Sequence, residues 1–155
     1  MYKKMKVLAI DPGNEESAYV LLDKETYKPL EFGKVDNTRL LMLLLELEYQ
    51  ELAIEMIASY GMPVGREVFE TCVWIGRFIQ IRQCPDFEYI YRKDEKMCLC
   101  GSMKAKDSNI RQALIDRFGE VGTKKNQGFF YGFKKDIWAA MAVGVTYIDR
   151  SKGLC

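Results

Sequence analysis

The first third of the chain alternates short hydrophobic runs with turn-forming residues. Three such runs occupy residues 6–10, 17–23 and 29–35. Apolar runs of this length, separated by glycine, proline, asparagine and aspartate, are typical of strands joined by tight turns. The pattern therefore predicts a three-stranded antiparallel meander over the first 36 residues.

Beyond the meander, two further strand-like runs alternate with helical spacing. The predicted strands are 51–57 and 87–91, and the predicted helices are 37–48, 65–82, 93–100, 107–118 and 135–149. Residues 119–135 contain four glycines, four lysines and four aromatic residues without a period, which predicts a mobile loop. This mixture in 155 residues predicts one α/β domain, a mixed sheet with helices on its faces.

The helix predicted at 65–82 has two apolar stripes. One consists of Val68, Cys72, Ile75 and Ile79, and the other of Trp74, Phe78 and Ile81. One stripe is expected to pack on the sheet. The stripe of Trp74, Phe78 and Ile81 then contacts either a second copy of the chain in a homodimer or another helix of the same chain, and the sequence leaves both open.

Three acidic residues interrupt these apolar patterns from the inside. Asp11 and Glu55 each share a strand face with aliphatic residues, and Asp136 begins the last helix on its apolar side. Taken singly, each has a structural explanation, as a turn residue, an edge-strand charge or a helix N-cap. Together they suggest one site, because adjacent strand ends and a crossing helix bring such side chains close.

Converging carboxylates need a compensating charge, because like charges raise one another's pKa. Hard divalent cations prefer oxygen ligands, so Mg²⁺ or Mn²⁺ is the expected occupant of a site made by Asp11, Glu55 and Asp136. Two such ions about 4 Å apart activate a water and stabilise the leaving oxygen of a phosphodiester. The three acids therefore favour phosphodiester hydrolysis.

Most of the chain carries segments whose order is familiar. They are VLAIDPGNEESAYVLLD, LAIEM, FEYIYRKDEKMCLCGSMKAKDSNIRQAL and DIWAAMAVGVTY. In turn, these resemble the opening hairpin, the second acidic strand, the basic loop with its helix, and the final helix of the RuvC-type Holliday-junction resolvases, in the RNase H-like superfamily. The short chain and divergent middle look most like the bacteriophage branch.

The resemblance implies an RNase H-like fold, a mixed five-stranded sheet with three antiparallel strands followed by parallel ones and flanked by helices. It also implies a homodimer, Mg²⁺-dependent cleavage of four-way and other branched DNA, and metal ligands matching Asp11, Glu55 and Asp136. A further family acid, three residues after the last, is Ala139 here. Asp149 is a poor replacement, because thirteen residues of helix place it about 20 Å away. The missing ligand keeps open a second reading, a junction-binding module with weakened cleavage.

The net charge is only +1, so DNA binding depends on where the 23 lysines and arginines lie. The residues expected to border the metal site and bind phosphates are Lys104, Lys106, Arg111, Lys124, Lys125, Lys134 and Lys135. Asp107 occupies the aligned position of a basic residue in the family. The aromatic residues Phe129, Phe130, Tyr131 and Phe133 are candidates either for stacking on unpaired bases or for the core.

The cysteines, the apolar runs and the turn after the first strand exclude several other kinds of protein. The five cysteines form no CxxC pair and the chain has no histidine, so we expect reduced cysteines that serve as small buried side chains. The alternative for Cys98 and Cys100 is a pair of metal ligands or a redox pair. We expect neither a signal peptide nor a membrane span, and a cytoplasmic location, in the host if the gene is phage-encoded. An Asp-x-Gly turn also occurs in actin-like ATPases and sugar kinases, but these need two domains to enclose a nucleotide, so no nucleotide cofactor is expected.

Overall fold

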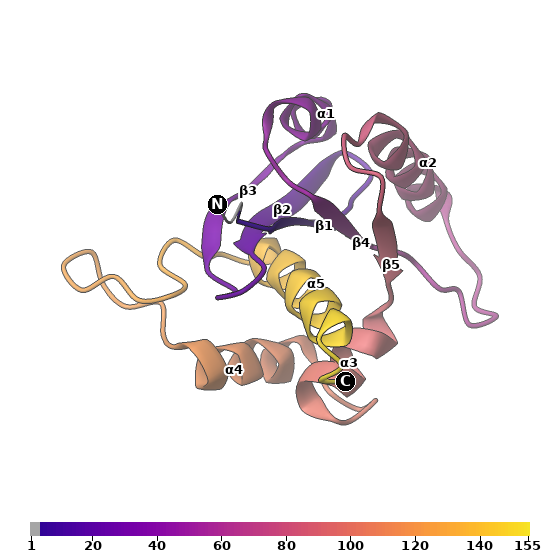
Figure 1. The fold of residues 1–155 in the computed structure, drawn as a ribbon. Helices are drawn as coiled ribbons and strands as arrows, with labels where there is room; N and C mark the ends of the chain where they lie inside the picture. The colour runs from indigo at the N-terminus through magenta and orange to yellow at the C-terminus, as the bar shows by residue number, and fades with distance from the viewer. Residues whose placement is uncertain (1–3) are drawn as a thin grey trace.

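The computed structural model describes residues 4–155 and contains a five-stranded mixed sheet (Figure 1). The strands are β1 (Lys6–Asp11), β2 (Glu16–Asp23), β3 (Pro29–Asp36), β4 (Glu51–Glu55) and β5 (Phe87–Ile90). Their order is β3-β2-β1-β4-β5; β1 pairs antiparallel with β2 and parallel with β4, and β5 is parallel to β4. The predicted meander and the mixed sheet are confirmed.

Five helices cover the sheet, close to the predicted positions. They are α1 (Asn37–Glu46), α2 (Arg66–Ile81), α3 (Arg92–Cys100), α4 (Asp107–Phe118) and α5 (Asp136–Ser151). Helices α1 and α2 lie on one side of the sheet, whereas α5 crosses the other side with α3 and α4 beyond it (Figure 1). Local signals set the helix ends: the Asp36 side chain accepts a hydrogen bond from the Arg39 amide, and Gly101 ends α3 with a φ of 66°.

Alternating side chains of β1 point into two separate cores. Val7 and Ala9 join the core under α5, whereas Leu8 and Ile10 join the core under α1 and α2. Helix α5 lies very close to the sheet, because a Cβ added at Gly144 would be 2.5 Å from the Leu22 Cδ1 atom. By the same alternation, the side chain of the last residue of β1 is on the α5 side.

The segment 119–135 is better anchored than the expected mobile loop. A bridge between Gly122 and Gln127 closes its outer part, while Phe130 and Phe133 are buried in the core under α5. The Phe130 ring lies 4.8 Å from that of Trp138, and the half-buried Phe129 ring stacks on that of Phe118 at 5.1 Å. The prediction of a mobile loop is wrong for this part, and Phe130 and Phe133 are not available to stack on bases.

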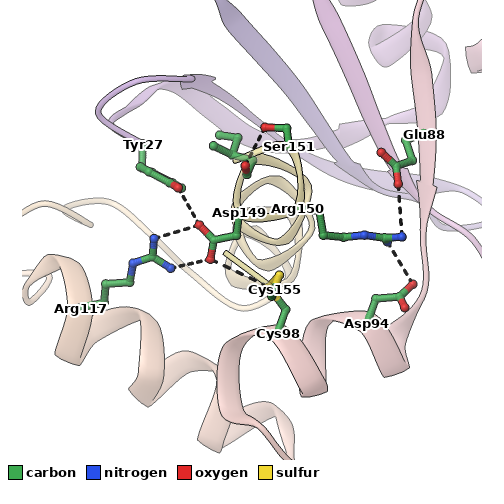
Figure 2. Close-up of a disulfide and its surroundings, with 10 residues drawn as sticks. Tyr27, Glu88, Asp94, Cys98, Arg117, Asp149, Arg150, Ser151 and Cys155 are labelled. Carbon is green, nitrogen blue, oxygen red and sulfur yellow. Dashed lines mark hydrogen bonds and ion pairs between the residues drawn. A yellow bond between two sulfur atoms is a disulfide. The ribbon is translucent and has the colours of Figure 1, made fainter. Parts of the chain in front are cut away.

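The expectation of reduced cysteines is wrong for one pair. Cys98 at the end of α3 forms a disulfide with Cys155, with the two Cα atoms 5.3 Å apart, beside the C-terminal end of α5 (Figure 2). Cys84 is buried, and Cys72 and Cys100 are partly buried free thiols. None of the helices in residues 4–155 is long and apolar enough to cross a membrane.

Candidate metal centre

Asp11 and Glu55 end neighbouring parallel strands. The register pairs Ile10 of β1 with Ile54 of β4, so the next residue of each strand reaches the same edge of the sheet. Both acids follow residues of the core under α5 at alternate positions, Ala9 and Ala53, and therefore face that helix. Parallel neighbours lie about 4.8 Å apart, which places the two carboxylates side by side.

Asp136, the first residue of α5, reaches the same edge from above. Its carboxylate lies 2.6 Å from the Lys34 ammonium group. Lys34 on β3 is paired with Ala18 of β2, and Ala18 is paired with Asp11 of β1. Lys34 therefore lies in the same row across the sheet as Asp11, and its partner Asp136 lies near the end of β1. The three acids therefore lie near the same edge of the sheet, and their role as one metal site stays a prediction.

The charges of the three acids interact. Burial, together with the smaller effects of the negative charges of Glu55 and Asp136, raises the pKa of Asp11 to about 7. Arg92 and Lys34 act the other way, but their effect on Asp11 is smaller. A carboxyl group with this pKa binds a proton or a cation readily near neutral pH.

The three carboxylates are gathered loosely. Within residues 4–155, the only trio of acidic or cysteine side chains with ligand atoms all within 4.8 Å of one another is Cys98, Asp149 and Cys155, in which both sulfurs are bonded together. Asp11, Glu55 and Asp136 are therefore spread more widely than the ligands of a single small ion. Carboxylates spread this widely would suit a pair of ions about 4 Å apart better than one ion.

A fourth acid, Glu95, belongs to this cluster, and the sequence analysis missed it. It lies in the first turns of α3 and its side chain is fully buried. Burial raises its pKa far above the usual range, and the adjacent Glu55 and the charge of Asp11 act in the same direction. One signal was available: Leu99 lies one helical turn later, on the same face, and packs against the core under α5.

Two hollows open on either side of Asp136. The smaller, about 280 Å³, is lined by Asp11, Lys34 and the turn after β1. The larger, about 530 Å³, is lined by Arg92, Arg111 and Lys135 among others, and we call it the basic hollow. Negative charge at the end of the sheet thus adjoins a concave surface with three cations.

Comparison with known proteins gives no match in sequence to any family model or curated protein. Solved structures do match. RuvC from Thermus thermophilus superimposes with a TM-score of 0.73, at 15% identity, over 97% of this chain and 98% of that one. RuvC from T. thermophilus in complex with a Holliday junction substrate gives 0.70, at 13% identity, over 97% of both chains. The yeast mitochondrial Holliday junction resolvase Ydc2 gives 0.67, at 13% identity, over 99% of this chain and 83% of that one.

The chain has the RNase H-like fold. Matches that cover almost the whole of both chains, together with the 3-2-1-4-5 strand order, support this conclusion independently of sequence identity. The expected five-stranded sheet is confirmed. Within the RNase H-like fold, Asp11, Glu55 and Asp136 lie at the ends of β1, β4 and the start of α5.

The predicted phosphate-binding residues lie at different distances from the acids. Arg111 and Lys135 line the basic hollow beside Asp136, and the Arg111 guanidinium lies 4.8 Å from the centre of the Trp138 ring. The others are exposed on connections around the RNase H-like core; they are Lys104 and Lys106 before α4, Lys124 and Lys125 between Gly122 and Gln127, and Lys134 before α5.

Two cations at the acids were not predicted. Arg92 forms ion pairs with both Glu95 and Asp107, and Lys34 pairs with Asp136. Asp107, which occupies a basic position of the resembling family, is therefore compensated by Arg92, and Arg92 also lines the basic hollow. One cation of the basic hollow thus comes from α3 and is ion-paired with a buried acid.

The predicted dimer stripe on α2 requires a correction. Phe78 is fully buried in the core under α1 and α2, so its side chain is not available to another chain. Trp74 and Ile81 are partly buried beside the same core. The large apolar side chains that α2 exposes to solvent are Phe69 and Val73, which are 62% and 64% exposed. The helical period predicted for α2 was right, but the exposed apolar face contains Phe69 and Val73, next to the predicted stripe rather than on it.

Proposed function

We propose that this protein is a metal-dependent, structure-selective endonuclease that cleaves Holliday junctions and other branched DNA. The observation that supports it best is the meeting of Asp11, Glu55 and Asp136 at one edge of an RNase H-like sheet. The same fold occurs in RuvC in complex with a Holliday junction substrate and in the resolvase Ydc2, both of which match nearly the whole chain.

The residues present suit a divalent cation. The Glu55 Oε2 atom is buried and has no hydrogen-bond partner, and burial next to two acids raises the pKa of Asp11 to about 7. All the candidate ligands are carboxylate oxygens, which Mg²⁺ prefers and Mn²⁺ accepts. Asp11, Glu55 and Asp136 would hold the ions, and bound ions would activate the attacking water and stabilise the leaving oxygen.

The remaining side chains have roles that follow from their positions. Arg92, Arg111 and Lys135 in the basic hollow would bind backbone phosphates and set the position of the scissile bond beside Asp136. The exposed lysines on the connections would extend this contact along the DNA arms, because phosphate contacts are tolerant of sequence. Recognition of a branched substrate thus depends on shape and charge.

The proposed assembly is a homodimer. Phe69 and Val73 are large, exposed apolar side chains on one face of α2, and Trp74 lies partly exposed beside them. An apolar helix face of this kind suits a symmetric contact with the same helix of a second copy. Two active sites related by a twofold axis would make paired nicks on a four-way junction.

Asp11→Asn tests the proposal. We expect this variant to bind a synthetic four-way junction as tightly as the wild type and to cleave it at least about a thousandfold more slowly with Mg²⁺ or Mn²⁺. Arg39→Gln, an exposed change on α1, is the matched control and retains full activity. Mapping the nicks on both strands also tests the dimer, which predicts cuts in symmetrical pairs.

The alternative is a junction-binding module with weak or no cleavage. Two observations favour it: the family's further acid is Ala139 here, and the Asp136 carboxylate is paired with Lys34. A wild-type chain that binds junctions but leaves them uncut with either metal would establish this alternative. A chain that neither binds nor cuts branched DNA would refute both.

A further inference from the structure

Glu95 is placed at the acidic edge by the topology of the sheet. Strand β5 runs parallel to β4, and Ile90 is paired with Glu55, so the chain leaves β5 at the edge where β4 ends. Helix α3 begins two residues later, and Glu95 is in its first turns. Its side chain has no exposed surface and interacts with the charges of Glu55 and Asp11.

Two oxygens in this cluster have no donor. Glu55 Oε2 and Glu95 Oε2 are both buried and both lack a hydrogen-bond partner. The other Glu95 oxygen has a long contact of 3.4 Å with Arg92 Nη1, one of two ion pairs that Arg92 forms, and the Glu95 carboxyl is also hydrogen-bonded to the Glu55 side chain. Burying an unpaired carboxylate is costly, so a proton or a cation is required between these two acids.

The surroundings of Ala139 explain why the fourth carboxylate comes from elsewhere. Ala139 faces the basic hollow together with Arg92, Arg111 and Lys135. That side of α5 therefore faces cations suited to phosphate, whereas α3 brings a buried carboxylate next to Glu55 and within the electrostatic range of Asp11. The number of acids around the site is thus four, although one of them occupies a different element.

We propose that Glu95 is a ligand of the divalent-ion site and replaces, from α3, the carboxylate that α5 lacks at Ala139. This inference rests on the proposed function, because it assumes that Asp11, Glu55 and Asp136 bind metal. In this proposal Glu55 and Glu95 would bind one ion, and Asp11 and Asp136 would supply the remaining carboxylates of a two-ion site.

The test is a calorimetric titration of the chain with Mn²⁺, which measures the number of bound ions and their affinity. The wild type is compared with Glu95→Gln, Asp11→Asn and Glu67→Gln, the last being an exposed glutamate on α2. We expect Glu95→Gln to lose one bound ion or to bind Mn²⁺ at least about tenfold more weakly, since even outer-shell partners of metal ligands contribute roughly 10- to 100-fold. Glu67→Gln should match the wild type.

Stability without metal separates ligation from folding. In EDTA, Glu95→Gln should unfold at a urea concentration equal to or above that of the wild type, because the glutamine amide can donate to Glu55 Oε2. If Glu95→Gln does not fold, Glu95→Asp retains the carboxylate one methylene further back, and its Mn²⁺ affinity should be weakened in the same direction.

The outcomes distinguish this inference from the proposed function. If Glu95→Gln binds Mn²⁺ with unchanged stoichiometry and affinity while Asp11→Asn loses binding, Glu95 is not a ligand and the nuclease proposal stands. If Glu95→Gln does not fold and Glu95→Asp binds Mn²⁺ like the wild type, Glu95 is likewise excluded. A wild-type chain that binds no Mn²⁺ overturns both.

Discussion

Helix α5 carries an aspartate near each end, and the two have different surroundings. At the C-terminal end, Asp149 is 4% exposed and accepts hydrogen bonds from Arg117 Nη1 and Nη2 at 2.7 and 2.9 Å and from the Tyr27 hydroxyl at 2.6 Å (Figure 2). At the N-terminal end, Asp136 has one exposed lysine partner.

The difference distinguishes an aspartate whose hydrogen bonds are all made within the chain from acidic residues whose oxygens still lack a partner. All the donors that Asp149 needs come from the chain itself, and together they tie α5 to α4 and to the turn between β2 and β3. At the other end, the charge of Asp136 acts on Asp11, and Glu55 and Glu95, the acids beside Asp11, each keep a buried oxygen without a donor. A buried network is stable when every member is satisfied, so the N-terminal end is completed only by a proton or a cation.

Breaking the satisfied end should have the largest effect on folding. Arg117→Met leaves Asp149 buried with only the Tyr27 hydroxyl as a donor, and we expect a loss of about 2 kcal/mol in the free energy of unfolding, measured in urea. Fully buried pairs lose roughly 3–5 kcal/mol, and the value is smaller here because the Arg117 side chain is 38% exposed.

Arg150→Met is the matched control. Arg150 is also 38% exposed, but its partners Glu88 and Asp94 lie 3.5 Å away and are more exposed than Asp149 (Figure 2). The expected loss is at most about 0.5 kcal/mol. Equal losses in the two variants would mean that Asp149 is no better satisfied than a surface acid, and the contrast between the ends of α5 would be lost.

The acids near the N-terminal end of α5 should make the free energy of unfolding depend on pH when metal is absent. The pKa of Asp11 is about 7 in the folded chain against a model value of 3.8, so between these values the folded state binds more protons than the unfolded state. Stability therefore falls as pH rises through this window. Glu95, whose pKa burial raises from an ordinary value of 4.5, acts in the same direction over this window and above it.

We expect the wild-type chain in EDTA to lose about 1–2 kcal/mol of unfolding free energy between pH 5 and pH 8. Asp11→Asn should lose less, because asparagine does not titrate. The measurement is urea unfolding at both pH values. A stability that is constant or increases over this range would show that the acids are already compensated by the chain.

Sequence reasoning predicted what depends on periodicity. The faces of β1 and β4 follow from alternation alone, so the sequence places Asp11 and Glu55 on strand faces shared with core residues, which in the fold are the faces under α5. The start of α5 at Asp136 follows from the break between an aperiodic segment and a helical one. These features are local, and the parallel pairing of β1 and β4 brings them together.

What failed depends on contacts between distant elements. Glu95 lies in the polar stretch RKDEKMCLC, where the choice between Asp94 and Glu95 as the inward acid is made by packing of α3 against α5. The Phe78 side chain points into the core because α1 packs beside α2 on the same side of the sheet. Spacing alone could not pair Cys98 with Cys155, because cysteine positions leave connectivity open.

The smallest expected change in stability is at the ion pair of Lys34 with Asp136. Both side chains are more than 40% exposed, so Lys34→Met should change the free energy of unfolding by at most about 0.5 kcal/mol. Mn²⁺ binding should become tighter, because the ammonium group no longer competes with the ion for the Asp136 carboxylate. Arg66→Met, which removes an exposed ion pair with Glu70 on α2, is the control and should leave Mn²⁺ affinity unchanged. Weaker Mn²⁺ binding in Lys34→Met would instead make Lys34 a positioning residue that holds Asp136 toward the site, and both ends of α5 would then rely on cations from the chain.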